Sequence, residues 1–365
     1  MGRFGNQADQ FLGVLNFAQK LNRTLVLPPW VEYVPGDRNA RMVPFETYFK
    51  VEPLKRYLRV VTMEEFMESI APKIWPPHER ISLCWAAREA IVSKPKSSEP
   101  SCNAKDGNPF GPFWDHFGVE FVGSSFYGQT TGGTDVDNAA MLRRWTKSYA
   151  PSDRKVLSFT GAPSQFPVKS EHRRLHEYLE WSEDVARRAE QFIAQQFNNQ
   201  PYLGVHLRHD VDWASACEHV APEGQQYHFF ASSQCLGDRF EFGRLTRRLC
   251  MPTRDDVLNQ VSALVKDVGL KWVFVAADKN HLIEELNRRF RSDGIQAQAR
   301  RSEPDEPHVS LALLGRADRF VGNCLSTFSA FAKRERDARR LPSDFWNFPQ
   351  PPDAAASTGS ARTDL

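Results

Sequence analysis

The sequence predicts an α/β protein with two Rossmann-like lobes, and three observations support this prediction. Apolar runs of strand length alternate with amphipathic helical patterns, which is typical of doubly wound parallel sheets. Three distinctive segments (residues 2–6, 206–213 and 322–328) follow expected strands or open expected helices, where such sheets bind ligands. The length of 365 residues corresponds to about two domains. We therefore expect two lobes that face a central cleft.

The N-terminal lobe is expected to span residues 1–198. Apolar residues at helical spacing predict a helix over about 7–21, and residues 24–27 are typical of a short buried strand. Residues 30–170 are rich in proline and aromatic residues and allow few elements to be placed. Within them, residues 108–115 are expected to form a rigid aromatic loop, because proline and glycine disfavour regular structure.

The C-terminal lobe is expected to span residues 199–330. Ser182 begins a helix with acidic residues in its first turn, and Thr253 caps a second helix that Gly269 ends. Strands are expected at 202–207, 272–277 and 319–321, and further helices at about 280–292, 309–314 and 326–340. Residues 331–350 are expected to return to the N-terminal lobe, and residues 351–365 to form a flexible tail.

Composition excludes several classes of protein. Hydrophobic residues make up 41% and charged residues 25%, so the chain is not disordered as a whole. The 47 basic and 45 acidic residues give a net charge of +2, which offers no reason to expect a nucleic-acid partner. No apolar run reaches the roughly 20 residues that a membrane-spanning helix needs.

Several features bear on the cellular compartment. None of the six cysteines stands in a CxxC pair, which argues against zinc knuckles; reduced thiols and disulfides remain equally open. Residues 362–365 resemble a KDEL-type retrieval signal, and Asn22 begins a glycosylation sequon. The start of the chain has no signal-peptide pattern, and a glycine-rich turn such as residues 2–6 normally follows a strand. We therefore expect the true N-terminus, with its signal peptide, to be missing from this sequence.

The segment around Arg208 carries the strongest chemical signal. Strand alternation places His206 and Arg208 on one side of a strand end. An arginine there offers a fixed, always charged fork that suits two phosphate oxygens. The alternative is a local ion pair of Arg208 with Asp210 or Asp212.

Two helix starts are further candidates for phosphate binding. Ser326 and Thr327 stand at a strand-to-helix turn, where free backbone N–H groups and hydroxyls can hold a pyrophosphate. Ordinary helix capping explains these residues equally well. Residues 2–6 precede another expected helix, so the backbone N–H groups there are also candidates for phosphate binding. The basic run at 333–336 is interpreted as a solvated helix face, because Glu335 interrupts it.

Two competing functions are also suggested by short motifs. Arg208 and His209 resemble the start of the histidine-phosphatase signature, but Asp210 stands where that signature has glycine. Residues 210–212 match the Asp-x-Asp by which many glycosyltransferases hold manganese. Residues 135–137 repeat that pattern, and neither copy has a convincing set of further ligands. We therefore expect no dedicated metal site.

Together these patches resemble the protein O-fucosyltransferases that attach fucose to Ser or Thr of EGF-like repeats. The resemblance covers nearly the whole chain and rests on residues 2–7, 22–24, 75–77, 107–115, 206–208 with 212–213, and 322–337.

The resemblance implies a GT-B-like fold, a GDP-fucose donor, inversion at the anomeric carbon, no obligatory metal or other cofactor, and a location in the lumen of the endoplasmic reticulum. It assigns the donor site to Arg3, Phe4, Gly5, Asn6, His206, Arg208, Ser326, Thr327 and Phe328. Asp212, Asp278 and Ser310 are further candidates, although some members carry Asp at the position of Ser310. The implied disulfides are Cys84–Cys102, Cys217–Cys250 and Cys235–Cys324.

On physical grounds, the mechanism that we expect is leaving-group catalysis. Arg208 is expected to stabilise the departing β-phosphate, and Asn6 is expected where the acceptor hydroxyl meets the donor. No Asp or Glu stands out as the general base; Asp212 is one candidate, and proton transfer to the departing phosphate through Asn6 is an equal alternative. The expected partners are EGF-like repeat proteins such as Notch-type receptors, and the expected state is a monomer. The alternatives are a non-catalytic lectin or chaperone for EGF repeats, and a phosphatase-like hydrolase that uses His209.

Overall fold

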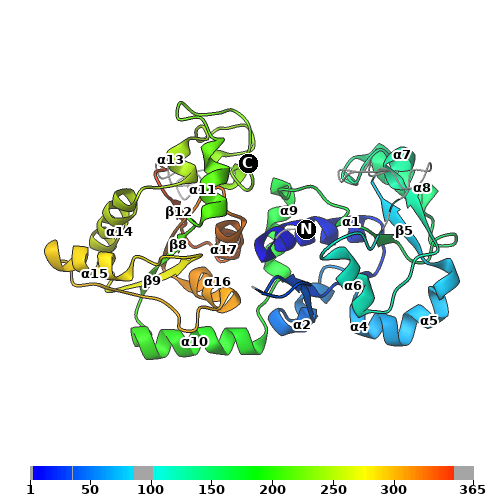
Figure 1. Cartoon of the computed structure of the whole chain (residues 1–365), viewed down its shortest axis with the longest axis horizontal. Coiled ribbons are helices and arrows are strands. Elements are labelled where there is room, and N and C mark those ends of the chain that lie inside the picture. The colour runs from blue at the N-terminus through cyan, green and yellow to red at the C-terminus, as the bar shows by residue number, and fades with distance from the viewer. Residues whose placement is uncertain (1–2, 35, 86–101, 103, 349–365) are drawn as a thin grey trace, which may run out of the picture. The chain divides into compact units, whose positions relative to one another are not determined.

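A computed structural model describes residues 3–34, 36–85, 102 and 104–348, and the chain divides into two compact units. Unit 1 is Met1–Asp184 and unit 2 is Val185–Leu365 (Figure 1). The expected boundary at residue 198 is therefore wrong. Helix α10 (Glu183–Phe197) belongs almost entirely to unit 2, because its Phe197 ring packs on Tyr202 and Trp272 with centroid distances of 4.9 and 5.6 Å.

Unit 1 opens with the expected helix and strand. Helix α1 (Phe4–Lys20) is followed by β1 (Leu25–Leu27), which confirms both elements to within a few residues. The other strands are β2 (Trp30–Glu32), β3 (Arg41–Val43), β4 (Val60–Thr62), β5 (Ile81–Cys84), β6 (Gly123–Phe126) and β7 (Ser158–Phe159). They form a parallel pair β1–β4, an antiparallel pair β2–β3 and a parallel sheet of order β6-β5-β7.

Mostly short helices make up the rest of the regular structure of unit 1. They are α2 (Phe45–Tyr48), α3 (Glu52–Lys55), α4 (Met63–Glu65), η1 (Phe66–Ile70), α5 (Ala71–Ile74), η2 (Pro77–Glu79), α6 (Phe110–His116), α7 (Tyr127–Thr131), α8 (Ala139–Ser148), α9 (Ser170–Arg173) and η3 (Arg174–Tyr178). The expected aromatic loop at 108–115 is thus wrong, since α6 runs through it. Pro112 lies in the first helical turn, where the missing N–H has no intrahelical partner and costs little.

Unit 2 is built on one five-stranded parallel sheet. Its order is β10-β9-β8-β11-β12, and each neighbouring pair runs parallel. The strands are β8 (Tyr202–Leu207), β9 (Trp272–Ala277), β10 (Gln298–Arg300), β11 (Arg319–Gly322) and β12 (Asp344–Phe345). The first two coincide with the expected strands at 202–207 and 272–277, and β11 extends its prediction by one residue.

Unit 2 has eight described helices; the sequence predicted five of them and none of the three between residues 211 and 250. They are α10, α11 (Val211–Glu218), α12 (Ser233–Leu236), α13 (Arg247–Cys250), α14 (Arg254–Val268), α15 (Ile283–Ser292), α16 (Pro307–Arg316) and α17 (Thr327–Ala338). Thr253 caps α14 through a reciprocal capping box, and Gly269 ends it in the left-handed conformation. The expected helix at 280–292 starts later, because Leu282 precedes it at φ +53°.

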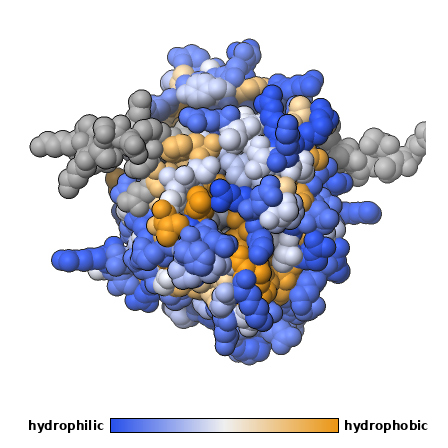
Figure 2. Space-filling view, turned by 90° about the vertical axis from the view of Figure 1, so that its right-hand side faces the viewer, coloured by the Kyte–Doolittle hydropathy of each residue, from blue (hydrophilic) through white to orange (hydrophobic). Residues whose placement is uncertain are grey.

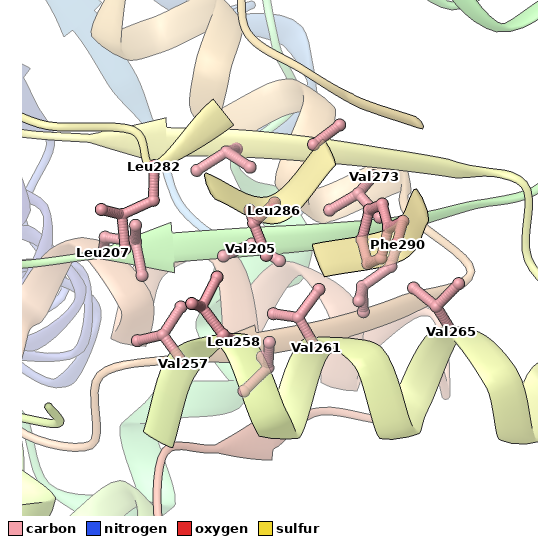
Figure 3. Close-up of a cluster of buried hydrophobic side chains, with 14 of the residues drawn as sticks. Val205, Leu207, Val257, Leu258, Val261, Val265, Val273, Leu282, Leu286 and Phe290 are labelled. Carbon is pink, nitrogen blue, oxygen red and sulfur yellow. The ribbon is translucent and has the colours of Figure 1, made fainter. Parts of the chain in front are cut away.

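The core of unit 2 lies where the sheet meets α14 and α15 (Figure 3). Val205 and Leu207 of β8 face Val261 of α14, and Leu286 and Phe290 of α15 close over them. Each of these side chains is at most 1% exposed. Burial on this scale stabilises the unit by about 1.5–3 kcal/mol per large aliphatic side chain. The strands that carry the candidate site residues are therefore rigidly held.

Helix α17 departs from two expectations. It packs against α16 within unit 2, and β12 follows it in the same sheet, so residues 331–345 do not form a helix returning to the other lobe. Its basic run is not a solvated face either: Arg334 and Glu335 are 5% exposed and Arg336 is fully buried. The Arg336 guanidinium donates to the carbonyls of Leu314, Ala317, Asp318 and Pro342, and burial lowers its pKa to about 10.

The cysteines pair as the resemblance implied. Cys84–Cys102 lies in unit 1, and Cys217–Cys250 and Cys235–Cys324 lie in unit 2. The last two pairs belong to one apolar cluster beneath α11 and the turn before α17. Among the described residues no helix is long and apolar enough to cross a membrane. The expected tail at 351–365 and the glycine at position 2 lie outside the described residues.

Candidate functional site

The carboxyl ends of three neighbouring strands of unit 2 gather the charged and polar candidates. His206 and Arg208 lie at the end of β8, Asp278 follows β9, and Ser326 follows β11. Because these strands are parallel and adjacent, residues distant in sequence meet at one edge of the sheet. This is the edge at which the sequence predicted ligand binding.

Arg208 is held between two carboxylates. Its side chain is 14% exposed, its Nη2 donates to Asp212 at 2.7 Å, and its Nη1 donates to Asp278. The guanidinium also lies over the Trp213 ring, 5.1 Å from the centroid, which adds a cation–π contact. Burial lowers the pKa of Arg208, but the hydrogen bonds to Asp212 and Asp278 outweigh it and raise the pKa. The ion-pair alternative from the sequence is thus realised with Asp212 rather than Asp210.

The two carboxylates differ in exposure and in bonding. The Asp278 side chain is 13% exposed and also accepts hydrogen bonds from the backbone N–H groups of His209 and Asp210, at 3.1 and 3.0 Å. Burial raises the pKa of Asp278, but the N–H of His209 and the guanidinium of Arg208 outweigh it and keep the pKa below its usual range. The Asp212 side chain is 55% exposed and lies one helical turn after Arg208. Asp278 is therefore the structural partner and Asp212 the exposed one.

His206 is buried and neutral. It is 4% exposed, and burial lowers its pKa to about 3. Its Nδ1 lies 2.7 Å from the hydroxyl of Ser329, which accepts from the N–H of Asn323 at 2.9 Å. The Ser329 proton can therefore go to Nδ1, which leaves the ring proton on Nε2 as a hydrogen-bond donor. The Phe328 ring packs on this imidazole at 4.7 Å between centroids.

The start of α17 completes the edge. Ser326 is the N-cap, and its hydroxyl accepts from the N–H of Phe328 at 3.3 Å, so the ordinary capping role is present. Thr327 and Phe328 form the first turn and are partly exposed. A helix of 12 residues begins here, and its first N–H groups present a partial positive charge. The hydroxyl of Ser326 can therefore cap α17 while other N–H groups of the first turn bind an anion.

His209 is poorly arranged as a nucleophile. Its Nε2 accepts a hydrogen bond from the N–H of Asn280 at 3.2 Å, and burial lowers its pKa. The lone pair that an attack on phosphorus requires is thus already engaged. The geometry disfavours the phosphatase alternative.

The unit 1 candidates lie in the first turn of α1. Arg3 is its exposed N-cap residue, and its carbonyl accepts from the N–H of Asn6 at 3.0 Å. Phe4 packs on Trp30, 4.9 Å between centroids, and Gly5 is buried. Asn6 is partly exposed, so its side chain is accessible at the start of a 17-residue helix. The sequence predicted a turn over residues 2–6 and a helix from about residue 7; the helix begins earlier, at Phe4, so part of the expected turn is its first helical turn.

The two Asp-x-Asp motifs are engaged in other contacts. Asp210 caps α11 by accepting from the N–H of Val211 at 2.7 Å. In unit 1, Asp135 and Asp137 both bind the ammonium group of Lys169. Ligand atoms of Asp137, Glu171 and His172 lie within 4.8 Å of one another, as in a cation site. The Lys169 ammonium lies 3.4 and 3.8 Å from Asp137 and Glu171, so a cation already sits among these carboxylates.

Two further candidates lie apart from Arg208. Ser310 is 1% exposed in α16, and its hydroxyl donates to Asp305 at 3.3 Å; Asp305 in turn contacts His281 at 3.0 Å. Asn22 is exposed at the end of α1, with φ +50°, and its side-chain oxygen accepts from Arg59 at 3.2 Å.

Sequence reasoning missed the supporting contacts of the site. It did not anticipate Ser329 as the partner of His206 or the Trp213 ring beneath Arg208. The contact of Ser329 with His206 has one signal in the sequence: Ser329 follows the Ser326 cap by three residues, which places both on one face of the helix. Asp278 was a candidate only as the residue that ends a strand, and its contact with Arg208 spans 70 positions.

Comparison with known proteins identifies the family. A family model described as GDP-fucose protein O-fucosyltransferase matches residues 1–339. The chain belongs to this family. As a GDP-fucose protein O-fucosyltransferase it is a glycosyltransferase, which sets aside the lectin and hydrolase alternatives.

The relatives resemble this O-fucosyltransferase over nearly its whole length. GDP-fucose protein O-fucosyltransferase 1 of Caenorhabditis elegans is 45% identical over 337 residues, which cover 92% of this chain and 85% of that protein. A crystal structure of POFUT1 in complex with GDP has 44% identity and a TM-score of 0.88, and covers 95% of this chain and 96% of its own. A complex of POFUT1 with GDP-fucose has 43% identity and a TM-score of 0.87, over the same shares. The expected GT-B-like α/β class is confirmed by these matches.

Proposed function

We propose that this O-fucosyltransferase transfers fucose from GDP-fucose, with inversion, to a Ser or Thr hydroxyl of folded EGF-like repeats. The observation that carries the proposal is the guanidinium of Arg208, with a side chain 14% exposed, which Asp278 holds at the carboxyl edge of the unit 2 sheet. That the POFUT1 relative was crystallised with GDP-fucose supports the choice of donor. Arg208 is proposed as the group that meets the charge of the leaving β-phosphate.

The chemistry demands positive charge on the leaving group. As the bond between the anomeric carbon and the β-phosphate oxygen breaks, the sugar becomes oxocarbenium-like and the diphosphate gains negative charge. A fixed guanidinium stabilises that charge more in the transition state than in the ground state. The first N–H groups of α17, with Ser326 and Thr327, are proposed to bind the same diphosphate.

We propose that this charge stabilisation needs no divalent metal. The support is the engagement of both carboxylates of the Asp-x-Asp motif, since Asp210 caps α11 and Asp212 binds Arg208. Each carboxylate therefore has one oxygen in a contact within the protein. Arg208 supplies the positive charge that such a cation would carry.

The acceptor step needs a hydroxyl oriented toward the anomeric carbon. Asn6 is proposed to orient it through its side-chain amide. The hydroxyl oxygen forms the new bond to the anomeric carbon as the bond to the β-phosphate breaks, and the hydroxyl proton ends on the departing diphosphate or on Asp212. Asp212 is 55% exposed and ionisable, which suits the second route.

The disulfides support a location in the lumen of the endoplasmic reticulum. Three pairs are formed, and such bonds persist in oxidising compartments. EGF-like repeats fold in the same compartment, so enzyme and acceptor would meet there. The exposed sequon at Asn22 fits N-glycosylation on this route. We propose Notch-type receptors as partners and a monomeric enzyme.

The test is release of GDP from GDP-fucose in the presence of a folded EGF repeat. Arg208→Ala is expected to reduce the rate at least about 10³-fold, the upper end of what one lost transition-state contact costs. Arg288→Ala removes an exposed arginine of α15 and is the matched control with an unchanged rate. EDTA is expected to leave the rate unchanged.

Three outcomes contradict the proposal. If Arg208→Ala releases GDP nearly as fast as the parent enzyme, Arg208 does not stabilise the leaving group. Loss of activity in His209→Ala with Arg208→Ala unaffected supports the hydrolase chemistry instead. Full inhibition by EDTA, restored by added Mn²⁺, overturns the metal-free mechanism.

A further inference from the structure

A buried hydroxyl beside the candidate site has no role in the proposed function. Ser329 lies in the first turns of α17 and is fully buried. Hydrophilic side chains cover most of the molecular surface, as Figure 2 shows for one face, and water can satisfy their hydrogen bonds there. The Ser329 hydroxyl depends on protein partners instead, so its few contacts decide where its proton lies.

The hydroxyl oxygen of Ser329 has two contacts among the described residues. The backbone N–H of Asn323 donates to it at 2.9 Å, and Nδ1 of His206 lies 2.7 Å from it. The side chain of Asn323 donates to the carbonyl of Cys250 at 2.7 Å and accepts from the N–H of Leu325 at 3.0 Å. Asn323 is therefore held in place, and its N–H is a fixed donor to the hydroxyl oxygen.

The proton of the Ser329 hydroxyl has one acceptor within reach. If Nδ1 of His206 were protonated, it too would donate to the hydroxyl oxygen, and the hydroxyl proton would have no acceptor among the described residues. A buried donor that lacks an acceptor costs free energy. If Nδ1 carries no proton, it accepts from the hydroxyl and all three groups are satisfied. The geometry therefore favours the tautomer of His206 with its proton on Nε2.

The second ring nitrogen of His206 is available to a ligand. Burial lowers the pKa of His206 to about 3, so the neutral ring carries a single proton and the two tautomers are true alternatives. No hydrogen bond within the described part of the chain involves Nε2. Nε2 is also not one of the buried side-chain atoms that lack a partner there. A ligand at this edge of the sheet can therefore reach it.

Both partners of this contact are held by packed elements of unit 2. Val205 and Leu207 turn toward α14 (Figure 3), so His206 between them faces the other side of the sheet, where Ser329 meets it. The His206 carbonyl accepts from the indole N–H of the fully buried Trp346 at 3.0 Å.

The end of β11 is shaped for the same contact. A Cβ atom at Gly322 would lie 2.7 Å from the hydroxyl oxygen of Ser329, which is closer than side chains approach one another. Glycine therefore allows the strand to pass directly beside this hydroxyl. The next residue, Asn323, can then direct its N–H to Ser329.

We infer that Ser329 is a positioning residue that fixes the tautomer and orientation of His206, so that the Nε2–H group donates to the diphosphate of the donor substrate. The inference rests on the proposed function in one respect, which is the identity of this anion. With the opposite tautomer, Nε2 would present a lone pair to the anion, and a lone pair repels a phosphate oxygen. Ser329 acts through His206 because its own hydroxyl is fully buried.

The first experiment reads the tautomer directly. The ring nitrogens of the histidines are isotopically labelled in the full chain, and NMR spectra are recorded without nucleotide. The signals of His206 are those that are missing in His206→Gln. We expect a protonated Nε2 and an unprotonated Nδ1 at neutral pH. A proton on Nδ1 overturns the inference, and this measurement needs no change at Ser329.

The second experiment separates an effect through His206 from a structural effect on the turn before α17. Calorimetry measures the affinity for GDP of the parent, Ser329→Ala, His206→Gln and the double variant. Glutamine places an amide N–H near the position of Nε2 and needs no proton from Ser329. We expect Ser329→Ala to weaken GDP binding about 10-fold in the parent and less than about 2-fold in the His206→Gln chain.

Ser262→Ala is the matched control. It removes another buried hydroxyl of unit 2, in α14, which has no hydrogen-bond partner among the described residues, and the affinity for GDP is expected to stay unchanged.

Two results of the second experiment overturn the inference. An equal loss of affinity with and without His206 means that Ser329 acts on the turn alone, and an unchanged affinity of Ser329→Ala means that it does not act on the anion at all. The tautomer is read without nucleotide and the affinities without fucose transfer. Failure of this inference therefore leaves the role of Arg208 in the leaving-group step untouched, and failure of that role leaves the tautomer of His206 unchanged.

Discussion

Unit 1 and unit 2 organise similar elements differently. Unit 2 carries one five-stranded sheet whose two central strands have six residues each. Unit 1 divides its described strands among three small sheets, and none of these strands exceeds four residues. Unit 2 packs a mainly aliphatic cluster of α14 and α15 against its sheet, whereas unit 1 depends on aromatic clusters such as Trp30 with Phe45 and Phe49.

The difference shows why the charged candidates around Arg208 are built on unit 2. A continuous parallel sheet fixes the ends of β8, β9 and β11 relative to one another, so Arg208, Asp278 and Ser326 are positioned by rigid elements. Short strands in separate sheets hold the strand ends of unit 1 less firmly relative to one another. Electrostatic catalysis requires groups that do not reorganise during the reaction, which the continuous sheet provides.

The largest expected effect on stability tests whether the units unfold separately. Arg336→Met removes a fully buried guanidinium that satisfies four carbonyls of unit 2, and those carbonyls lose their donors. We expect a loss of about 3–5 kcal/mol in the unfolding free energy of unit 2. Hydrogen exchange of β8 and of β5 measures the two units side by side.

The exposed neighbour provides the control. Arg339→Met alters a partly exposed arginine of the same helix end and should cost less than about 1 kcal/mol. Equal acceleration of exchange in β5 and β8 by Arg336→Met would mean that both units unfold as one, against the comparison above.

The second effect sharpens the roles of the two carboxylates around Arg208. Asp278→Asn keeps the size of the side chain but removes the charge that holds the guanidinium, so we expect the turnover rate to fall about 10²-fold. Asp212→Asn frees one side of Arg208 without disturbing the backbone of His209, and GDP is expected to bind more tightly. Calorimetry with GDP and steady-state rates separate binding from turnover.

A reversed pattern contradicts this division. If Asp212→Asn weakens GDP binding while Asp278→Asn leaves rate and affinity unchanged, the exposed carboxylate is the structural partner of Arg208. If Asp278→Glu keeps a turnover rate near that of the parent enzyme while Asp278→Asn does not, the charge at this position is what holds Arg208.

The smallest expected effect is a dependence of the stability of unit 2 on pH. Burial lowers the pKa of both His206 and His308 to about 3, below the ordinary value of 6.5. Between these values the unfolded chain binds more protons, so the unfolding free energy rises with pH and is lost as pH falls from 6.5 toward 3. Each histidine contributes up to about 1.4 kcal/mol per pH unit in that window.

Substitution of one histidine isolates its share. His308→Leu is expected to reduce the slope of unfolding free energy against pH by about half between pH 6 and 5. His219→Gln changes an exposed histidine and serves as the control. Urea unfolding followed at several pH values provides the measurement, and an unchanged slope in His308→Leu means that this histidine is protonated in the folded unit.

The second half of the chain was largely predictable because its signals are local. Thr253 and Gly269 mark both ends of α14, and the apolar run at 272–277 has no competing period. The first half was not, since strands of two to four residues have too few positions to show alternation. Helix α6 was missed for another reason. A proline such as Pro112 is compatible with a helix only in the first turn, and the composition of residues 108–115 does not show where the helix begins.

The amino-acid sequence alone identified the candidate donor residues, the cysteine pairs through the family resemblance, and the strands of unit 2, because motifs and periodicity are encoded over short stretches. Tertiary structure decided which groups act on one another. Asp278 meets Arg208 across 70 positions, and Arg336 turns inward from a charged run because carbonyls of α16 and its following loop need its donors. Burial and hydrogen-bond satisfaction are properties of the packed chain, and no local pattern specifies them.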